Sequence, residues 1–169
     1  MDAGEFSAPL KSELRARIEA VQKQGIEANK RLLAGRVDRC LNEMTSDVEK
    51  ALEEGKKALV LNLDIGADSK ASQKVIKAVQ KLAPELAFMG ISEEEVGSGG
   101  KILCFAVVPD ALVKEGLKAN EWTKEVLETC GGRGGGKPGS AQGQAPECSD
   151  VDAVIVKAES FVSNAVPVA

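Results

Sequence analysis

The segment CGGRGGGKPGSAQG, Cys130–Gly143, combines residue types that can hold an anion. Glycines leave successive backbone N–H groups uncovered, and such groups can form a concavity that binds an anion. Arg133 can hold a phosphate with its planar guanidinium, and Lys137 adds a second positive charge. The segment is not the nucleotide-binding pattern GxxxxGK[ST], because Pro138 follows the lysine. From the residues alone, two interpretations stay open: a flexible loop, or a loop that contacts phosphate or RNA, with a short edge strand over residues 140–144.

Missing residue types exclude several function classes. The sequence contains no histidine, which excludes histidine-activated nucleophiles and most catalytic zinc sites. The four cysteines show no CxxC spacing, so we expect reduced thiols, no metal and no cofactor, with Cys104 in an apolar run typical of a core. No apolar run is long enough to span a bilayer, and no signal-peptide pattern is present. We therefore predict a cytoplasmic protein with no membrane partner and no catalytic residues in this chain.

A second cationic feature precedes Pro84. Four lysines recur at intervals of four, three and four residues, which places them on one face of a predicted helix: Lys70, Lys74, Lys77 and Lys81. Apolar residues are predicted on the opposite face: Val75, Ile76, Val79 and Leu82. The lysine face is either ordinary solvated surface or a contact for a polyanion. Because the net charge is −4, any contact with nucleic acid must come from such a local patch.

Residues 9–55 show helical periodicity. Gly25 and Gly35 interrupt the pattern without turn residues beside them, so we prefer one long helix, with a helical hairpin as the alternative. A helix of this length cannot bury one face on a small core along its whole length. Its regularly spaced apolar residues are therefore predicted to pack on another helix, either a missing N-terminal partner or a second copy of the chain: Leu33, Val37, Leu41, Met44 and Val48.

The charges of this segment have the same two interpretations. Cations prevail over residues 10–39 and acids over residues 40–55, which favours antiparallel association into a homodimer. A solvated helix with ion pairs four residues apart accounts for the charges equally well. Residues 1–8, which begin with MDAGEF, are interpreted as residues added in cloning and are kept out of the fold.

From residue 56 the pattern changes to alternating strands and helices. The run ALVLNLDI over 58–65 predicts a buried strand, a helix follows between Asp68 and Pro84, and two strands over 86–91 and 101–109 predict a hairpin. A second helix precedes Cys130, with Asn120 as its predicted N-cap and Gly131 at its exit, and a third helix follows Ser149 or Asp150. The predicted fold is thus mixed α/β. A helical arm over 9–55 precedes a small globular domain over 56–169, whose mixed sheet is flanked by helices and which contains a glycine-rich loop over 131–143.

The segment GGRGGGKPGSAQG resembles the glycine-rich signature of the C-terminal domain of alanyl-tRNA synthetases, which is shared with the accessory domain of DHH-type phosphoesterases. The matching positions are Gly131, Gly132, Arg133, Gly134, Gly135, Gly136, Lys137, Pro138, Ala141 and Gln142. The chain departs from the bacterial pattern at Gly139-Ser140 and over 144–147. The phosphoesterase version carries a histidine in this loop, so the synthetase form is the better match.

The resemblance implies a non-catalytic appendage of an alanine–tRNA ligase. It implies that Gly132–Lys137 and Gln142 contact the outer corner of tRNA, that the appendage links the aminoacylation and editing modules, and that the helical part can mediate dimerisation. Two alternatives stay open: a dimerisation or protein-interaction module, and a general nucleic-acid-binding domain that also takes DNA.

Overall fold

The structure is a computed structural model, and it describes residues 8–95 and 97–166. Of the residues interpreted as cloning additions, 1–7 lie outside this described part, and Ala8 begins the first helix. This helix, α1 (Ala8–Glu53), runs without a break, so the single long helix is confirmed and the helical hairpin is wrong. The chain separates into two compact units, Met1–Gly35 and Arg36–Ala169, and α1 contributes to both.

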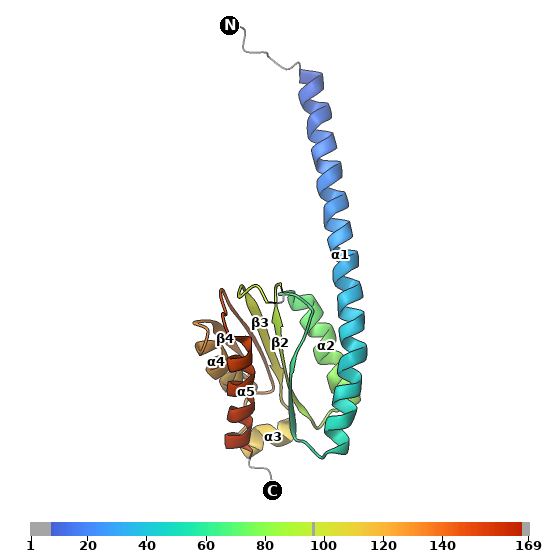
Figure 1. Ribbon diagram of the computed structural model, residues 1–169. Helices are drawn as coiled ribbons and strands as arrows, with labels where there is room; N and C mark the ends of the chain where they lie inside the picture. Colours follow the sequence, from blue (N-terminus) through green and yellow to red (C-terminus); the bar gives the residue numbers. More distant parts are fainter. Residues whose placement is uncertain (1–7, 96, 167–169) are drawn as a thin grey trace. The chain divides into compact units, whose positions relative to one another are not determined.

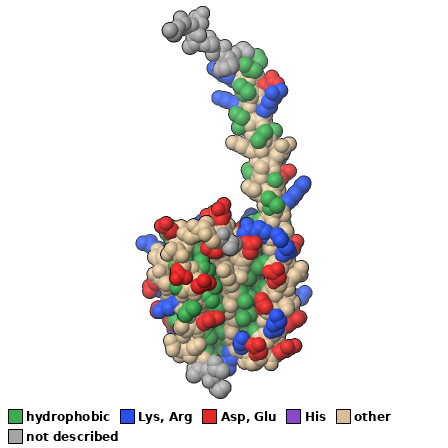
Figure 2. Space-filling view, viewed as in Figure 1, with side chains coloured by type: hydrophobic (Ala, Val, Ile, Leu, Met, Phe, Trp, Pro, Cys, Tyr) green, Lys and Arg blue, Asp and Glu red, His purple; other side chains and the backbone are tan. Residues whose placement is uncertain are grey.

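The first unit carries large apolar side chains on its surface. Along residues 8–35, six of them are exposed by 41–68%: Leu10, Leu14, Ile18, Val21, Ile26 and Leu32. Hydrophobic atoms are visible along this helical segment in Figure 2. Since burial of such side chains is the main gain from helix packing, this segment presents surface that a partner can cover.

The second unit is built on a mixed five-stranded sheet. Its strands are β1 (Ala58–Asn62), β2 (Ala87–Glu93), β3 (Ile102–Val107), β4 (Arg133–Lys137) and β5 (Ser140–Ala145), in the order β1-β2-β3-β5-β4. β1 and β2 are parallel and are connected through α2 (Ser69–Leu82), whereas the other neighbours are antiparallel. This arrangement confirms the mixed α/β fold and the predicted β2–β3 hairpin. The strand predicted to be buried, β1, is instead a half-buried edge strand, because only β2 pairs with it.

Helices cover both faces of this sheet (Figure 1). α4 (Ala119–Glu128) and α5 (Val151–Ala165) pack on the face that carries Met89 and Cys104, and Trp122 joins the two helices because its indole N–H donates to the carbonyl oxygen of Ala158 at 3.0 Å. α2 and residues 36–53 of α1 lie on the other face, where the rings of Phe88 and Phe105 pack with centroids 6.3 Å apart. A short helix that the sequence did not reveal, α3 (Asp110–Glu115), follows β3.

Carboxylate caps define the starts of two helices. Asp68 accepts a hydrogen bond from the backbone N–H of Lys70 at 2.7 Å and caps α2, which ends at Leu82 before Pro84 as predicted. Asp150 accepts from the backbone N–H of Ala153 at 2.9 Å and caps α5. Such caps satisfy N–H groups that have no partner inside the helix.

The ends of α4 differ in how well the sequence predicted them. Asn120 is not its N-cap: the helix begins at Ala119, whose N–H donates to the carbonyl oxygen of Pro138 at 2.7 Å. The contact with the hairpin turn therefore sets the start of the helix, and Asn120 falls inside its first turn. At the other end Gly131 has φ +64°, which confirms the left-handed exit predicted for this glycine.

Candidate nucleic-acid interface

The glycine-rich segment is a β-hairpin rather than a loop. β4 and β5 pair in register from Arg133 opposite Gln144 to Lys137 opposite Ser140, and Pro138 and Gly139 form the two-residue turn. The prediction of a loop is wrong because ladder bonds to a neighbouring strand form independently of side chains. The strand predicted over 140–144 is confirmed as β5, but its predicted place at the sheet edge is wrong, since β5 lies between β3 and β4, and β4 is the edge.

Backbone hydrogen bonds hold the hairpin at both ends. At the turn, the carbonyl oxygen of Pro138 accepts from Ala119, and that of Gly139 accepts from the N–H of Val108 at 2.9 Å. At the base, the N–H of Gly132 donates to the carbonyl oxygen of Leu127 at 2.8 Å. The segment is thus tied to α4 and to the residue after β3, which argues against the flexible-loop interpretation.

Four glycines of the hairpin and its base are required by the packing of the chain itself, among them Gly143, where a Cβ would lie 2.3 Å from Cα of Gly134. A Cβ on Gly134 would lie 2.8 Å from Cγ2 of Thr123 on α4, and a Cβ on Gly136 would lie 2.5 Å from the backbone of Ala141. Gly132 has a similar close neighbour in Ala145. Such distances are too short for a real side chain, so these glycines let β4 approach α4 and β5 closely. The sequence predicted that a ligand lies against these glycines. At Gly134 and Gly136, however, the protein itself fills that space.

Gly135 differs from its neighbours because its side-chain direction is open. A Cβ at this position meets nothing within 4 Å. Since side chains alternate along a strand, Arg133, Gly135 and Lys137 project from the face of β4 opposite to Gly134 and Gly136. The paired residues on β5 extend this surface: Ser140, Gln142 and Gln144. We call these six residues the hairpin face.

The hairpin face is polar and accessible. Arg133, Gly135, Lys137, Ser140 and Gln142 are exposed, and Gln144 is half-buried. The structure thus brings together four of the residues predicted to bind nucleic acid: Arg133, Gly135, Lys137 and Gln142. They form a nearly flat, open surface with two cations and an amide, whereas a concave nest would need consecutive non-extended residues.

The outer edge of β4 adds backbone donors. A two-residue turn is closed by hydrogen bonds between the two residues that flank it, here Lys137 and Ser140. In an antiparallel ladder, hydrogen-bonded pairs alternate with pairs that are not hydrogen-bonded, so Gly135 and Arg133 also bond to their partners on β5. The N–H groups of Gly134 and Gly136 then point away from β5, out of the sheet edge. They lie beside the cations and can donate to an anionic oxygen.

The four lysines of α2 are exposed, as predicted, but α2 packs on β2 and β3, while the hairpin packs on α4. The lysine face and the hairpin face therefore belong to elements that pack mainly on different neighbours. The apolar side of α2 also differs from the prediction at one position: Val75 and Val79 are fully buried, whereas Leu82 is 41% exposed. Leu82 is the last residue of the helix, after which the chain continues into β2.

The residues predicted to form an interface between copies occupy different environments. Val37, Met44 and Val48 are at most 3% exposed and belong to the core of the second unit. Leu41 is half-buried in the same unit, and Leu33, also half-buried, lies in the first unit. Val37, Met44 and Val48 therefore stabilise the fold of their own chain and offer no free surface.

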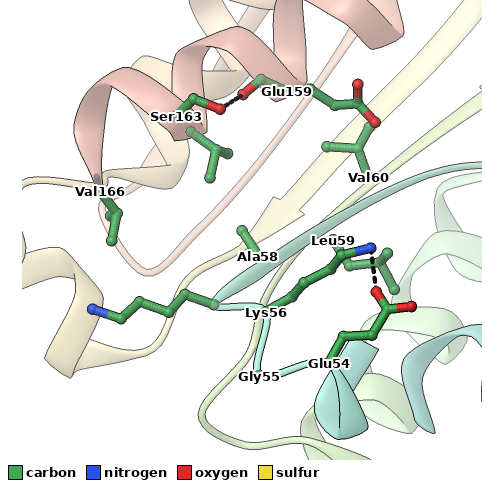
Figure 3. Close-up of a pocket in the computed structure, with 11 residues that line it drawn as sticks. Glu54, Gly55, Lys56, Ala58, Leu59, Val60, Glu159, Ser163 and Val166 are labelled. Carbon is green, nitrogen blue, oxygen red and sulfur yellow. Dashed lines mark hydrogen bonds and ion pairs between the residues drawn. The ribbon is translucent and has the colours of Figure 1, made fainter. Parts of the chain in front are cut away.

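An apolar hollow of about 390 Å³ lies beside the edge strand β1 (Figure 3). It is lined by residues 54–60 and by Glu159, Val162, Ser163 and Val166 on and after α5. Of the four charged residues that line it, Lys56 and Glu54 form an ion pair at 2.6 Å. Across residues 8–95 and 97–166, no helix could cross a membrane and no cluster of three metal-ligating side chains occurs.

Sequence reasoning missed two features of this region. Gln144 belongs to the hairpin face, and a Lys-Pro-Gly-Ser turn between two short segments was the signal that could have revealed it. Cys130 and Cys148, separated by 18 positions, meet at the base of the hairpin with their Sγ atoms 2.7 Å apart. No spacing rule predicts that contact, because it depends on the closure of the hairpin.

Fold and site together define a small mixed-sheet α/β domain that presents a glycine-rich hairpin with a cationic open face. The chain belongs to the DHHA1 domain family, whose family model matches residues 55–164. Among curated proteins, it is 38% identical over 106 residues to "Alanine--tRNA ligase, cytoplasmic" of Drosophila melanogaster, covering 63% of this chain and 11% of the fly protein. It is 33% identical over 156 residues to the protein of the same name from Caenorhabditis elegans, covering 92% of this chain and 15% of the nematode protein.

The chain therefore corresponds to a small part of these relatives. Among solved structures, it is similar to the C-Ala domain from Aquifex aeolicus alanyl-tRNA synthetase, with a TM-score of 0.48 and 17% identity, over 64% of this chain and 87% of that one. The resemblance to the C-terminal domain of alanyl-tRNA synthetases, first indicated by the glycine-rich motif, is confirmed by the family match and the sequence relatives.

Proposed function

We propose that this chain is a non-catalytic, tRNA-binding appendage of a cytoplasmic alanine–tRNA ligase. The relatives carry that name, and this chain spans 11–15% of their length, so the aminoacylation and editing centres would belong to other parts of such a protein. The proposed appendage contacts the outer corner of tRNA and helps to hold one tRNA for both modules. The functional division into an arm over 9–55 and a globular module over 56–169 is part of this proposal.

The observation that carries the proposal is the hairpin face. Arg133 and Lys137 lie two strand positions on either side of Gly135, so two cations flank a position with no side chain. A guanidinium can grip one phosphate through two hydrogen bonds or stack flat on an exposed base. The bare strand at Gly135 lets a ribose or base edge approach the sheet, and Gln142 can donate or accept beside it.

Binding of a tRNA to single-site variants tests this proposal. Arg133→Ala removes a charge-assisted contact and should weaken binding by roughly 1–3 kcal/mol. Gly135→Val should weaken binding as well, because its side chain fills the open position without meeting the protein. Lys124→Ala is the matched control, since Lys124 is an exposed cation on α4, away from the hairpin face.

Affinities are measured by fluorescence anisotropy at a salt concentration where the parent chain binds measurably. Equal affinities for Arg133→Ala, Gly135→Val, Lys124→Ala and the parent would contradict the proposal. Duplex DNA of similar length serves as the second ligand, because general binding of nucleic acid predicts equal losses on both ligands. Lys77→Ala tests whether the lysine face takes part in binding. If it does, the slope of the logarithm of affinity against the logarithm of salt concentration should fall by about 1 for each lost phosphate contact.

A second candidate function is self-association through residues 8–35. The observation that favours it is the row of exposed apolar residues on this segment, with Leu14, Ile18 and Val21 at intervals of four and three. A homodimer could bury these residues as a coiled coil does. The candidate is compatible with tRNA binding, because it uses the other compact unit of the chain.

A further inference from the structure

Two thiols meet at the base of the glycine-rich hairpin. Cys130 follows α4, which ends at Glu128, and Cys148 follows β5, which ends at Ala145. Their Sγ atoms are 2.7 Å apart, although both cysteines are free. That separation exceeds the length of a disulfide bond by only about 0.7 Å. The backbone thus already places the two sulfurs where little movement is needed to join them.

The thiol pair opens into solvent on one side. A hollow of about 590 Å³ is lined by residues 129–131 and 146–150, together with Gly99 and Ala153. Cys130 is half-buried at this hollow, whereas Cys148 is 2% exposed. A small reagent can therefore reach Cys130 first, with Cys148 positioned behind it as the second thiol.

The environment keeps Cys130 protonated. Burial and the hydrogen bond to Cys148 raise the pKa of the Cys130 thiol to about 12. Either thiol can donate the hydrogen bond between the two sulfurs. Because the thiolate is the nucleophile, the raised pKa makes Cys130 slow to react near neutral pH.

We propose that Cys130 and Cys148 form a modification site at which a reversible disulfide closes the base of the hairpin, with a low-molecular-weight disulfide as the oxidant. Cys130 loses its proton to solvent, and its sulfur attacks one sulfur of the oxidant, whose S–S bond breaks and releases one thiol after protonation. Cys148 then loses its proton, and its sulfur displaces the second thiol from Cys130. Two protein thiols are oxidised, one small disulfide is reduced to two thiols, and the reverse exchange restores the pair.

The new bond would constrain the segment that carries the hairpin face. It closes a loop between positions 18 residues apart, within which β4, the turn and β5 all lie. The backbone N–H of Cys148 donates to the carbonyl oxygen of Gly100 at 3.1 Å, so the cross-link also fixes the connection between β2 and β3. A cross-link of this kind stabilises chiefly by restricting the unfolded chain, and its formation does not depend on nucleic-acid binding.

The test uses the full chain in glutathione buffers with a rising ratio of oxidised to reduced form. We expect two thiols to be lost together and the mass to fall by two hydrogens, with no glutathione attached. Trypsin cleaves after Arg133 but not between Lys137 and Pro138, so the cross-link joins peptides 125–133 and 134–157. The thermal midpoint should rise by about 5–10 °C on oxidation, and reduction should restore the original value.

Variants separate this outcome from incidental oxidation. Cys130→Ser and Cys148→Ser should each abolish the cross-linked peptide and the rise in thermal midpoint, whereas Cys40→Ser, which removes a buried cysteine elsewhere, should retain both. If a serine variant fails to fold, the peptide map of the parent chain still shows whether Cys130 and Cys148 are cross-linked. Stable glutathione on Cys130, a cross-link to Cys104, or no loss of thiols at ratios that oxidise simple dithiols would overturn the proposal.

Discussion

At the residue scale, adjacent glycines of the hairpin have opposite roles. Gly134 faces α4, where a Cβ would lie 2.8 Å from Thr123 and 3.0 Å from Leu127, whereas Gly135 faces open space. We expect Gly134→Val to lower the free energy of unfolding by roughly 1–3 kcal/mol through overpacking, and Gly135→Val to change it by less than about 0.5 kcal/mol. Urea denaturation measures both values. Equal losses for the two variants would mean that β4 does not pack on α4 as described.

A buried thiol makes stability depend on alkaline pH. Burial raises the pKa of Cys104 in the folded chain to about 12, from 9.0. The unfolded chain therefore releases this proton above pH 9 while the folded chain keeps it, so the contribution is complete below pH 9 and is lost as pH rises towards 12.

Between pH 8 and 10 this single group should reduce the free energy of unfolding by about 1.4 kcal/mol. The Cys104→Ala chain should not show this pH-dependent loss, although the cavity that it creates lowers the free energy of unfolding at every pH. Comparing the two chains by urea denaturation at pH 8 and pH 10 isolates the effect. Parallel losses in both chains would show that Cys104 ionises alike in the folded and unfolded states.

At the element scale, the second half of α1 is part of the globular core. Val48 is fully buried, whereas Leu52, one turn further along the helix, is 45% exposed. Val48→Asp should therefore destabilise the chain by about 3 kcal/mol or more, because a carboxylate would be buried without a partner. Leu52→Asp, the matched change on the exposed side, should cost less than about 1 kcal/mol. Thermal denaturation distinguishes them, and a stable, folded Val48→Asp chain would contradict this packing.

At the scale of the whole molecule, the two compact units should be separable. Residues 36–169 contain the sheet, its covering helices and the buried part of α1, so a fragment of these residues should fold with the thermal midpoint of the full chain to within a few degrees. Sedimentation should show self-association of the full chain only, because the exposed apolar residues Ile18 and Val21 lie in the part removed. A dimeric fragment, or a full chain that remains monomeric at high concentration, would refute association through residues 8–35.

Patterns of side chains explain which elements were predictable. α2 and α5 were recognisable from apolar spacing and from the carboxylates of Asp68 and Asp150, and the β2–β3 hairpin from two apolar runs around a glycine-rich turn. β4 has the sequence RGGGK, which has no alternation of apolar and polar side chains to reveal a strand. Asn120 is a good cap by residue type, yet the hydrogen bond between Ala119 and Pro138 decided where α4 begins.

The sequence by itself determined the mixed α/β class, the long first helix, the family resemblance and the identity of the two hairpin cations, because these depend on local spacing and residue type. Only the tertiary structure decided which glycines serve packing and which one is open, that Val37, Met44 and Val48 are core, and that Cys130 meets Cys148. Each of these depends on what another segment places opposite the residue. A neighbour that comes close only when the sheet forms produces no periodic pattern in the sequence.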